Sequence, residues 1–103
     1  MDWETAAGGF SAMGSEARLQ VLKTLIRAGE PGLTVGEIQK RTQIAPSTLA
    51  HHLKFLAAGG LVEQERLGRS TITRARFSAL QALADFLLSE CCADLCREAA
   101  NDV

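Results

Sequence analysis

The 103-residue sequence lacks long apolar runs, and no stretch approaches the roughly 18 residues that a membrane-spanning helix needs. It begins Met-Asp-Trp-Glu-Thr, without the basic start and apolar stretch of a signal peptide. We therefore expect a cytoplasmic protein with no membrane partner. A chain of this length should form one domain, residues 1–103, and its small core would benefit from a second subunit.

The residue sets of common enzymes are also missing. The sequence has no glycine-rich phosphate loop, no Ser-His-Asp set and no clustered carboxylates suited to acid–base catalysis. We expect neither an enzyme nor a small-molecule substrate.

Cysteine is scarce and confined to one place. The three cysteines, Cys91, Cys92 and Cys96, lie within six residues. An odd number of cysteines in a cytoplasmic chain argues against a disulfide framework and favours metal binding or thiol chemistry.

The formal net charge of −1 conceals an uneven distribution. Residues 38–76 carry a net charge of +5, whereas the remainder carries −6. The basic residues of this segment are Lys40, Arg41, Lys54, Arg66, Arg69, Arg74 and Arg76. A run of basic residues is often only a solvent-exposed face. This one includes the helix predicted below from the stretch 45–62, whose polar face is suited to nucleic acid. The segment is therefore the electrostatic footprint expected for a nucleic-acid partner.

Helical patterns fill the first third of the chain. Asp2 is a candidate N-cap for a helix over 2–10, and Ser15 is one for a helix over 16–28. The second helix is the predicted core helix, with an apolar face formed by Leu19, Leu22 and Ile26 and flanked by Val21 and Leu25. Arg18, among these positions, is expected to pair with a carboxylate in the core.

Two short helices follow, joined by a tight connection. Thr34 and Glu37 form a predicted capping box for a helix over 35–41. The stretch 45–62 then predicts a second helix, which Gly59-Gly60 ends. Its apolar stripe consists of Leu49, Leu53 and Leu56, and its opposite face carries Ser47, Thr48, His51 and Lys54. The pair forms a helix-turn-helix, in which the first helix braces the second against the DNA major groove.

The pattern changes to β-forming residues after Gly60. Residues 61–67 and 70–76 are separated by Gly68-Arg69, which predicts a β-hairpin. Arg66 and Arg69 at its tip suit a wing that lies along the DNA backbone or in the minor groove. A last helix is predicted over 77–100, and its apolar stripe is broader than one core needs, which suggests a dimer face.

Four motifs resemble those of the ArsR/SmtB winged-helix repressors. They are Met13–Leu22 (MGSEARLQVL), Ser47–Leu56 (STLAHHLKFL), Gly60-Leu61-Val62 and Arg66–Arg69 (RLGR), and the second followed by the third is the most specific. The resemblance covers roughly residues 10–95. It implies a mainly α fold with a β-hairpin wing, in the order helix, helix, helix, helix, strand, strand, helix. It also implies a homodimer through the first and last helices, with an interface that contains Trp3, Phe10, Leu80, Leu83, Phe86 and Leu87.

The resemblance further implies a repressor that sits on palindromic operator DNA and leaves when an inducer binds. In the family, the positions that match Ser47, Thr48 and His51 approach base edges or phosphates. The full predicted DNA-binding set is Lys40, Arg41, Ser47, Thr48, His51, His52, Lys54, Arg66 and Arg69. Ala50 stands where a serine is common in the family, so one hydrogen bond to DNA is missing. The rival function is a winged-helix module used only for protein contacts, which would need neither the +5 segment nor the arginine-tipped wing.

The inducer predicted from the cysteines is a soft ion. Family members that sense soft ions in the third helix carry a Cys-x-Cys motif there, and this chain has none. Zinc sensors of the family place Asp and His on the last helix; Asp85 is present, but no histidine follows His52, so no zinc site is expected. Three thiolates without histidine suit trivalent arsenic or antimony, bound by Cys91, Cys92 and Cys96. On a straight helix these sulfurs diverge, so capture requires the helix end to bend. The alternative is a redox or persulfide switch that uses the same thiols.

Overall fold

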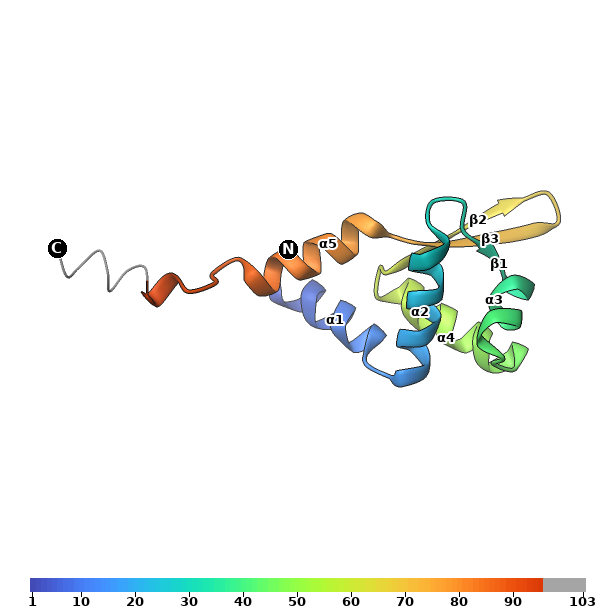
Figure 1. The fold of residues 1–103 in the computed structure, drawn as a ribbon, viewed down its shortest axis with the longest axis horizontal. Helices are drawn as coiled ribbons and strands as arrows, with labels where there is room; N and C mark the ends of the chain where they lie inside the picture. The colour runs from blue at the N-terminus through green and yellow to red at the C-terminus, as the bar shows by residue number, and fades with distance from the viewer. Residues whose placement is uncertain (96–103) are drawn as a thin grey trace.

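The computed structural model describes residues 1–95, which form five helices and three strands (Figure 1). The helices are α1 (Trp3–Met13), α2 (Glu16–Ala28), α3 (Val35–Thr42), α4 (Pro46–Ala58) and α5 (Phe77–Leu88). The strands are β1 (Leu33–Thr34), β2 (Val62–Leu67) and β3 (Ser70–Ala75). The predicted winged helix-turn-helix order is confirmed.

Each of the first three helices begins at the predicted capping residue. The side chains of Asp2, Ser15 and Thr34 accept hydrogen bonds from the backbone N–H three residues further on, and Glu37 completes the capping box. Helix α1 runs three residues beyond its predicted end at Phe10, through Gly8 and Gly9. Packing supports it there, because Leu83 of α5 lies directly against Gly9.

The sheet is antiparallel and has the strand order β1-β3-β2. The predicted hairpin is confirmed, with Leu67 opposite Ser70 across the Gly68-Arg69 turn, where Gly68 has φ +62°. The prediction missed β1, which pairs Leu33 with Thr73. Two residues are too few to give a period-two signal in the sequence.

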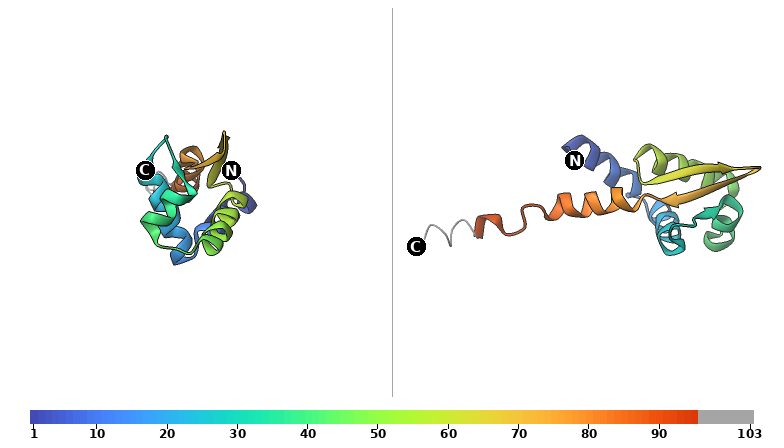
Figure 2. Two further views of the ribbon diagram at one scale, coloured as in Figure 1. Left: turned by 90° about the vertical axis from the view of Figure 1, so that its right-hand side faces the viewer. Right: turned by 90° about the horizontal axis from the view of Figure 1, so that it is seen from above.

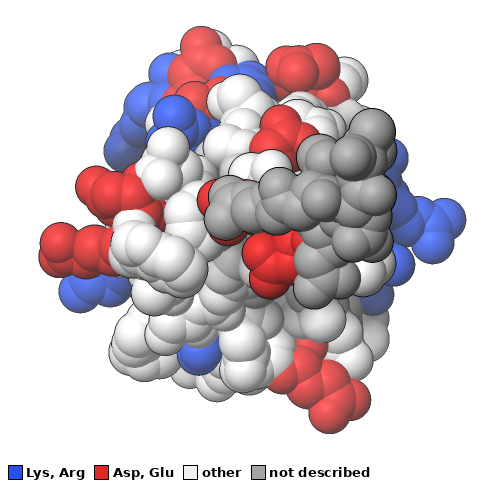
Figure 3. All heavy atoms as spheres, turned by 90° about the vertical axis from the view of Figure 1, so that its left-hand side faces the viewer, with Lys and Arg blue, Asp and Glu red and all other residues white. Residues whose placement is uncertain are grey.

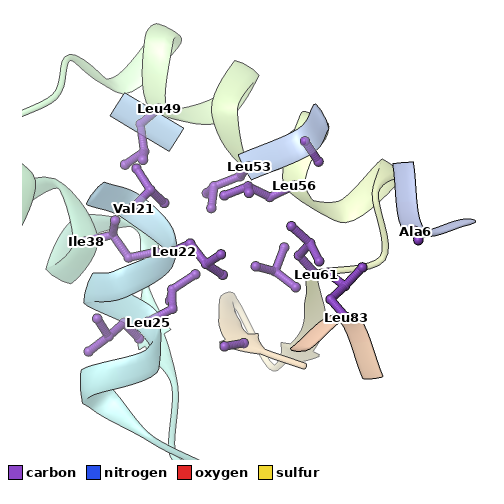
Figure 4. Packing of buried hydrophobic residues seen from close by; sticks show 14 residues of the cluster. Ala6, Val21, Leu22, Leu25, Ile38, Leu49, Leu53, Leu56, Leu61 and Leu83 are labelled. Atoms are coloured by element: carbon purple, nitrogen blue, oxygen red, sulfur yellow. The ribbon is translucent and has the colours of Figure 1, made fainter. Parts of the chain in front are cut away.

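The core lies where α2, α3, α4 and the sheet meet (Figure 4). Its fully buried side chains include Val21, Leu22, Leu25, Ile38, Leu49, Leu56 and Leu61. The predicted face of α2 is partly wrong, because Leu19 is 44% exposed and Ile26 is 37% exposed. Helix α2 packs against α3, α4 and β3 at once, and these neighbours cover the side of Val21, Leu22 and Leu25.

The last helix is shorter than predicted. Helix α5 ends at Leu88, and helical backbone resumes only at residues 93–95, within the range predicted as helix. The Ser89 hydroxyl donates a hydrogen bond to the Phe86 carbonyl (3.0 Å), and Cys91 N–H donates to the Leu88 carbonyl (2.9 Å). These local bonds replace the helical pattern with a turn over 89–92. The prediction for residues 96–100 lies outside the described residues.

The wing and the α1–α5 pair lie at opposite ends of the molecule, as the perpendicular views also show (Figure 2). Trp3 and Phe86 join α1 to α5 through an edge-to-face contact with ring centroids 5.1 Å apart. No helix within residues 1–95 is both long enough and apolar enough to span a membrane.

Candidate nucleic-acid interface

Helix α4 has one buried face and one polar exposed face. Leu49, Leu53 and Leu56 are at most 4% exposed, because they pack into the core beneath the helix. Ser47, Thr48, His51 and Lys54 are all exposed. The predicted division of the faces is confirmed, and it leaves hydrogen-bonding side chains free to contact a ligand.

The N-terminus of α4 also offers backbone donors. Its N-cap is Ala45, which forms no side-chain capping bond, and Pro46 occupies the first turn. The N–H groups of Ser47 and Thr48 have no acceptor one turn earlier within the helix. Helices α1, α2 and α3 are capped by side chains, whereas the starts of α4 and α5 are not, so the start of α4 is open to an external anion.

The connection from α3 to α4 places one cation, Lys40, beside this helix start. Gln43 adopts the left-handed conformation (φ 60°) and its side-chain amide donates to the Lys40 carbonyl (2.8 Å). Lys40 and Arg41 are exposed in the last turn of α3. Lys40 lines the same hollow as Ala45, the N-cap of α4, whereas Arg41 lines a hollow together with residues of α2.

The two histidines of α4 are placed differently. His51 is exposed, and its ring makes an edge-to-face contact with Phe55 at 4.9 Å between centroids. His52 is half-buried, and its Nδ1 is buried with no hydrogen-bond partner among the described residues. The structure therefore separates His52 from the exposed set with which it was predicted.

The wing presents its two predicted arginines to solvent. Arg66 and Arg69 are both exposed at the tip, and Arg66 Nε donates to the Gly68 carbonyl (3.3 Å). At the base of the wing, Arg74 pairs with Glu65 (2.9 Å) and donates to the Glu30 carbonyl (3.1 Å). Arg74 thus fixes the wing to the loop before β1, while the tip arginines extend from it.

The opposite end of the molecule has a different surface. Figure 3 shows mainly neutral surface there, bordered by carboxylates, with lysines and arginines towards the margins.

Arg18 has a different partner from the predicted carboxylate. Its Nε donates to the Ala12 carbonyl (2.6 Å) and its Nη2 to the Ser11 carbonyl (3.3 Å) at the end of α1. Its Cζ also lies 5.0 Å from the centre of the Phe55 ring. A helix C-terminus supplies partial negative charge, so it can take the place of a carboxylate.

Two of the three cysteines lie in the turn that follows α5. Cys91 and Cys92 are exposed, their Sγ atoms are 3.6 Å apart, and Cys92 has φ 60°. Because α5 has already ended, no distortion of a helix is needed to bring these two sulfurs together. Cys96 lies outside the described residues. Within residues 1–95 there is no group of three or more His, Cys, Asp or Glu side chains arranged to hold a metal ion.

The predicted dimer residues fall into two groups. Trp3 is 81% exposed and Leu87 is 64% exposed, so both offer free apolar surface at the α1–α5 end. Phe10, Leu80 and Phe86 are half-buried and pack on the core, whereas Leu83 is buried within the protomer.

Comparisons with known proteins agree with this geometry. A family model described as a helix-turn-helix domain matches residues 13–65. The uncharacterized HTH-type transcriptional regulator YbzH of Bacillus subtilis is 31% identical, over 79% of this chain and 93% of that protein. The transcriptional activator HlyU of Vibrio cholerae is 30% identical, over 74% of this chain and 68% of that protein.

Solved structures give the same result. An ArsR-like transcriptional regulator from Rhodococcus sp. RHA1 matches with a TM-score of 0.78 and 28% identity, over 96% of this chain and 90% of that one. The homodimeric winged helix-turn-helix DNA-binding domain Mb0332 from Mycobacterium bovis matches with a TM-score of 0.67 and 30% identity, over 84% and 81%. These similar proteins are transcriptional regulators and not enzymes, as predicted for this chain. The chain belongs to the ArsR family of winged helix-turn-helix transcriptional regulators.

Proposed function

We propose that the protein is a homodimeric repressor that binds double-stranded operator DNA and is released when trivalent arsenic or antimony binds Cys91, Cys92 and Cys96. The observation that carries the DNA-binding part is the two-faced burial of α4. Three leucines fix the helix in the core, and the face with Ser47, Thr48 and His51 remains open.

In the proposed complex, the exposed face of α4 lies along the major groove, and its N-terminal end faces a backbone phosphate. The side chains of Ser47, Thr48 and His51 reach base edges or phosphates, and the uncapped N–H groups receive a phosphate. Lys40, Arg41 and Lys54 add phosphate contacts, and Arg66 and Arg69 carry the wing along the backbone or minor groove. Because His52 is half-buried, it supports α4 from its inner side and contributes less to contact with DNA.

Trp3 is the most exposed aromatic residue within residues 1–95, and dimer formation through α1 and α5 would cover it. Trp3 stands at the start of α1 against Phe86, with the exposed Leu87 on the same helix as Phe86. Trp3→Ala should weaken the dimer, measured as a higher dissociation constant in analytical ultracentrifugation. Exposed Phe55, on α4, gives a control, since Phe55→Ala should leave the dimer unchanged.

The cysteine turn supports the proposed inducer. Two exposed sulfurs 3.6 Å apart lie within reach of one soft ion, because thiolate–metal bonds are about 2.3 Å long. Cys96 would supply the third thiolate.

DNA binding with and without arsenite tests the proposal. Fluorescence anisotropy on the DNA upstream of the protein's own gene should show tight, salt-dependent binding that arsenite weakens. The variants Cys91→Ser, Cys92→Ser and Cys96→Ser should bind DNA normally and respond poorly to arsenite, whereas Ser78→Ala, at an exposed position of α5, should respond like the unmodified protein. Normal release from a variant that lacks all three cysteines would exclude the cysteine site. Absent or salt-insensitive DNA binding would favour a protein-contact module.

The short distance between the Cys91 and Cys92 sulfurs also favours the second candidate, a redox switch. A peroxide could take two electrons and two protons from these thiols to form a disulfide. With one sulfide, two peroxides would take four electrons and four protons to form a trisulfide. An excess of a phosphine reductant, which has no thiol to bind arsenite, separates the two functions. Under reducing conditions arsenite should still release the DNA, whereas a redox switch would stay bound.

A further inference from the structure

A shallow hollow interrupts the exposed face of α4 beyond His51. It has a volume of about 210 Å³ and is lined by His51, Lys54, Phe55 and Ala58. Its walls are almost entirely carbon, and the Phe55 side chain that forms part of them is 44% exposed. An apolar hollow is unexpected on the face that carries hydrogen-bonding groups.

The walls of this hollow are held in place by a contact from α2, which is itself bonded to α1. The His51 ring meets Phe55 edge to face, and the Arg18 guanidinium lies 5.0 Å from the centre of the Phe55 ring. Arg18 is itself bonded to the Ala12 and Ser11 carbonyls of α1. The hollow is therefore preorganised before any ligand arrives.

The hollow continues the line of residues proposed to read DNA. Ser47, His51, Lys54 and Ala58 are spaced four, three and four residues apart, so they lie along one stripe of the helix. Two of the four lining residues, His51 and Lys54, belong to the predicted DNA-binding set. A ligand that enters the hollow would be part of the DNA that lies along this stripe.

We infer that this hollow receives the 5-methyl group of a thymine in the major groove, and that Phe55 is a specificity-determining residue. The inference rests on the proposed binding of DNA by α4. Thymine is the unmodified base that presents a methyl group in the major groove, whereas the other base edges present donors and acceptors there. Carbon walls cannot satisfy those polar groups, so a base other than thymine would lose hydrogen bonds to water without replacement.

Uracil interference on the DNA upstream of the protein's own gene tests the inference. Random replacement of thymine by deoxyuridine removes one methyl group at a time, and the bound and free DNA fractions are then compared. At one thymine in each half-site, loss of the methyl group should weaken binding about fourfold, the effect of exposing roughly one buried carbon. Phe55→Ala should bind the unmodified DNA more weakly and should no longer distinguish thymine from deoxyuridine there.

Two controls separate this inference from the function on which it rests. Ile26→Ala truncates an apolar residue of α2 that is 37% exposed, and it should keep the full thymine discrimination. Failure of the unmodified protein to bind the fragment would overturn the proposed function. Binding without any thymine-sensitive position, or with discrimination that survives in Phe55→Ala, would overturn only the thymine site.

Discussion

The packing of α1 against the end of α4 gives the sharpest prediction of stability. Gly59 is the C-cap of α4, and a Cβ atom built there would overlap the Cβ of Ala12 and lie 3.3 Å from the Gly8 carbonyl oxygen. Its φ of −79° suits any residue, so Gly59→Ala tests close packing without backbone strain. Because two helix backbones must separate to admit the methyl group, we expect a loss of about 1–3 kcal/mol in the free energy of unfolding.

Gly8→Ala is the matched control within α1. A Cβ at Gly8 would meet nothing within 4 Å, and the position lies inside the helix. Replacing an unconstrained helical glycine by alanine should therefore stabilise the protein by about 0.5–1 kcal/mol. The two variants make the same chemical change and should shift stability in opposite directions.

Urea denaturation at a fixed protomer concentration measures both effects, since a dimer's stability depends on concentration. Ala12→Gly should relieve the overlap, so adding Gly59→Ala to this background should cost less than it does alone. If Gly59→Ala lowers the free energy of unfolding equally with and without Ala12→Gly, the proposed overlap is refuted. A stabilising Gly59→Ala would refute the close packing of α1 on α4 altogether.

Three further predictions concern the sheet, a cap and the wing. Gly32→Ala should cost more than about 2 kcal/mol and lower the Tm, because Gly32 has φ +69° and its Cβ would lie 2.6 Å from a β3 carbonyl oxygen. The backbone N–H and hydroxyl of Thr34 hold the pKa of Glu37 below its ordinary value of 4.5. The ionised Glu37 side chain therefore stabilises the fold above pH 4.5, and this stabilisation is lost as the pH falls through the lowered pKa. In Glu37→Gln, the free energy of unfolding should therefore fall less steeply as the pH is lowered. An unchanged fall would show that Glu37 is not its cause. Arg66→Ala and Arg69→Ala should each reduce the slope of log affinity against log salt by about 1, and a variant that keeps the full slope would show that its arginine does not contact phosphate.

The features that depend on neighbouring residues could be predicted from the sequence. The caps at Asp2, Ser15 and Thr34 act over three residues, and the Leu49, Leu53 and Leu56 stripe acts over two helical turns. Such local patterns fix the start of a helix and its inward face before any tertiary contact is known.

The features that depend on distant segments could not be predicted in this way. The short β1 exists because Leu33 pairs with Thr73, forty residues later. Arg18 carries a charge that suggests a carboxylate, and only the arrangement of α1 supplies two carbonyls and the Phe55 ring in its place. The apolar hollow of α4 was missed for the same reason, because Phe55 alone reads as an ordinary apolar helix residue.

Helix α1 packs against both α4 and α5, and α5 leads into the cysteine turn. At one end, Trp3 contacts Phe86 and Gly9 receives Leu83, so α1 is packed against α5, which leads into the cysteine turn. At the other end, Ala12 packs against Gly59 and the last carbonyls of α1 hold Arg18 against Phe55.

Since α1 contacts both helices, we expect a shift of α5 relative to α1 to change the packing of α1 on α4. The proposed inducer therefore need not distort the end of a long helix, which is already a turn at Ser89–Cys92. It need only change how α5 packs on α1. Variants at the α1–α4 contact, such as Gly59→Ala, should therefore alter how far arsenite weakens DNA binding more than they alter the affinity for arsenite.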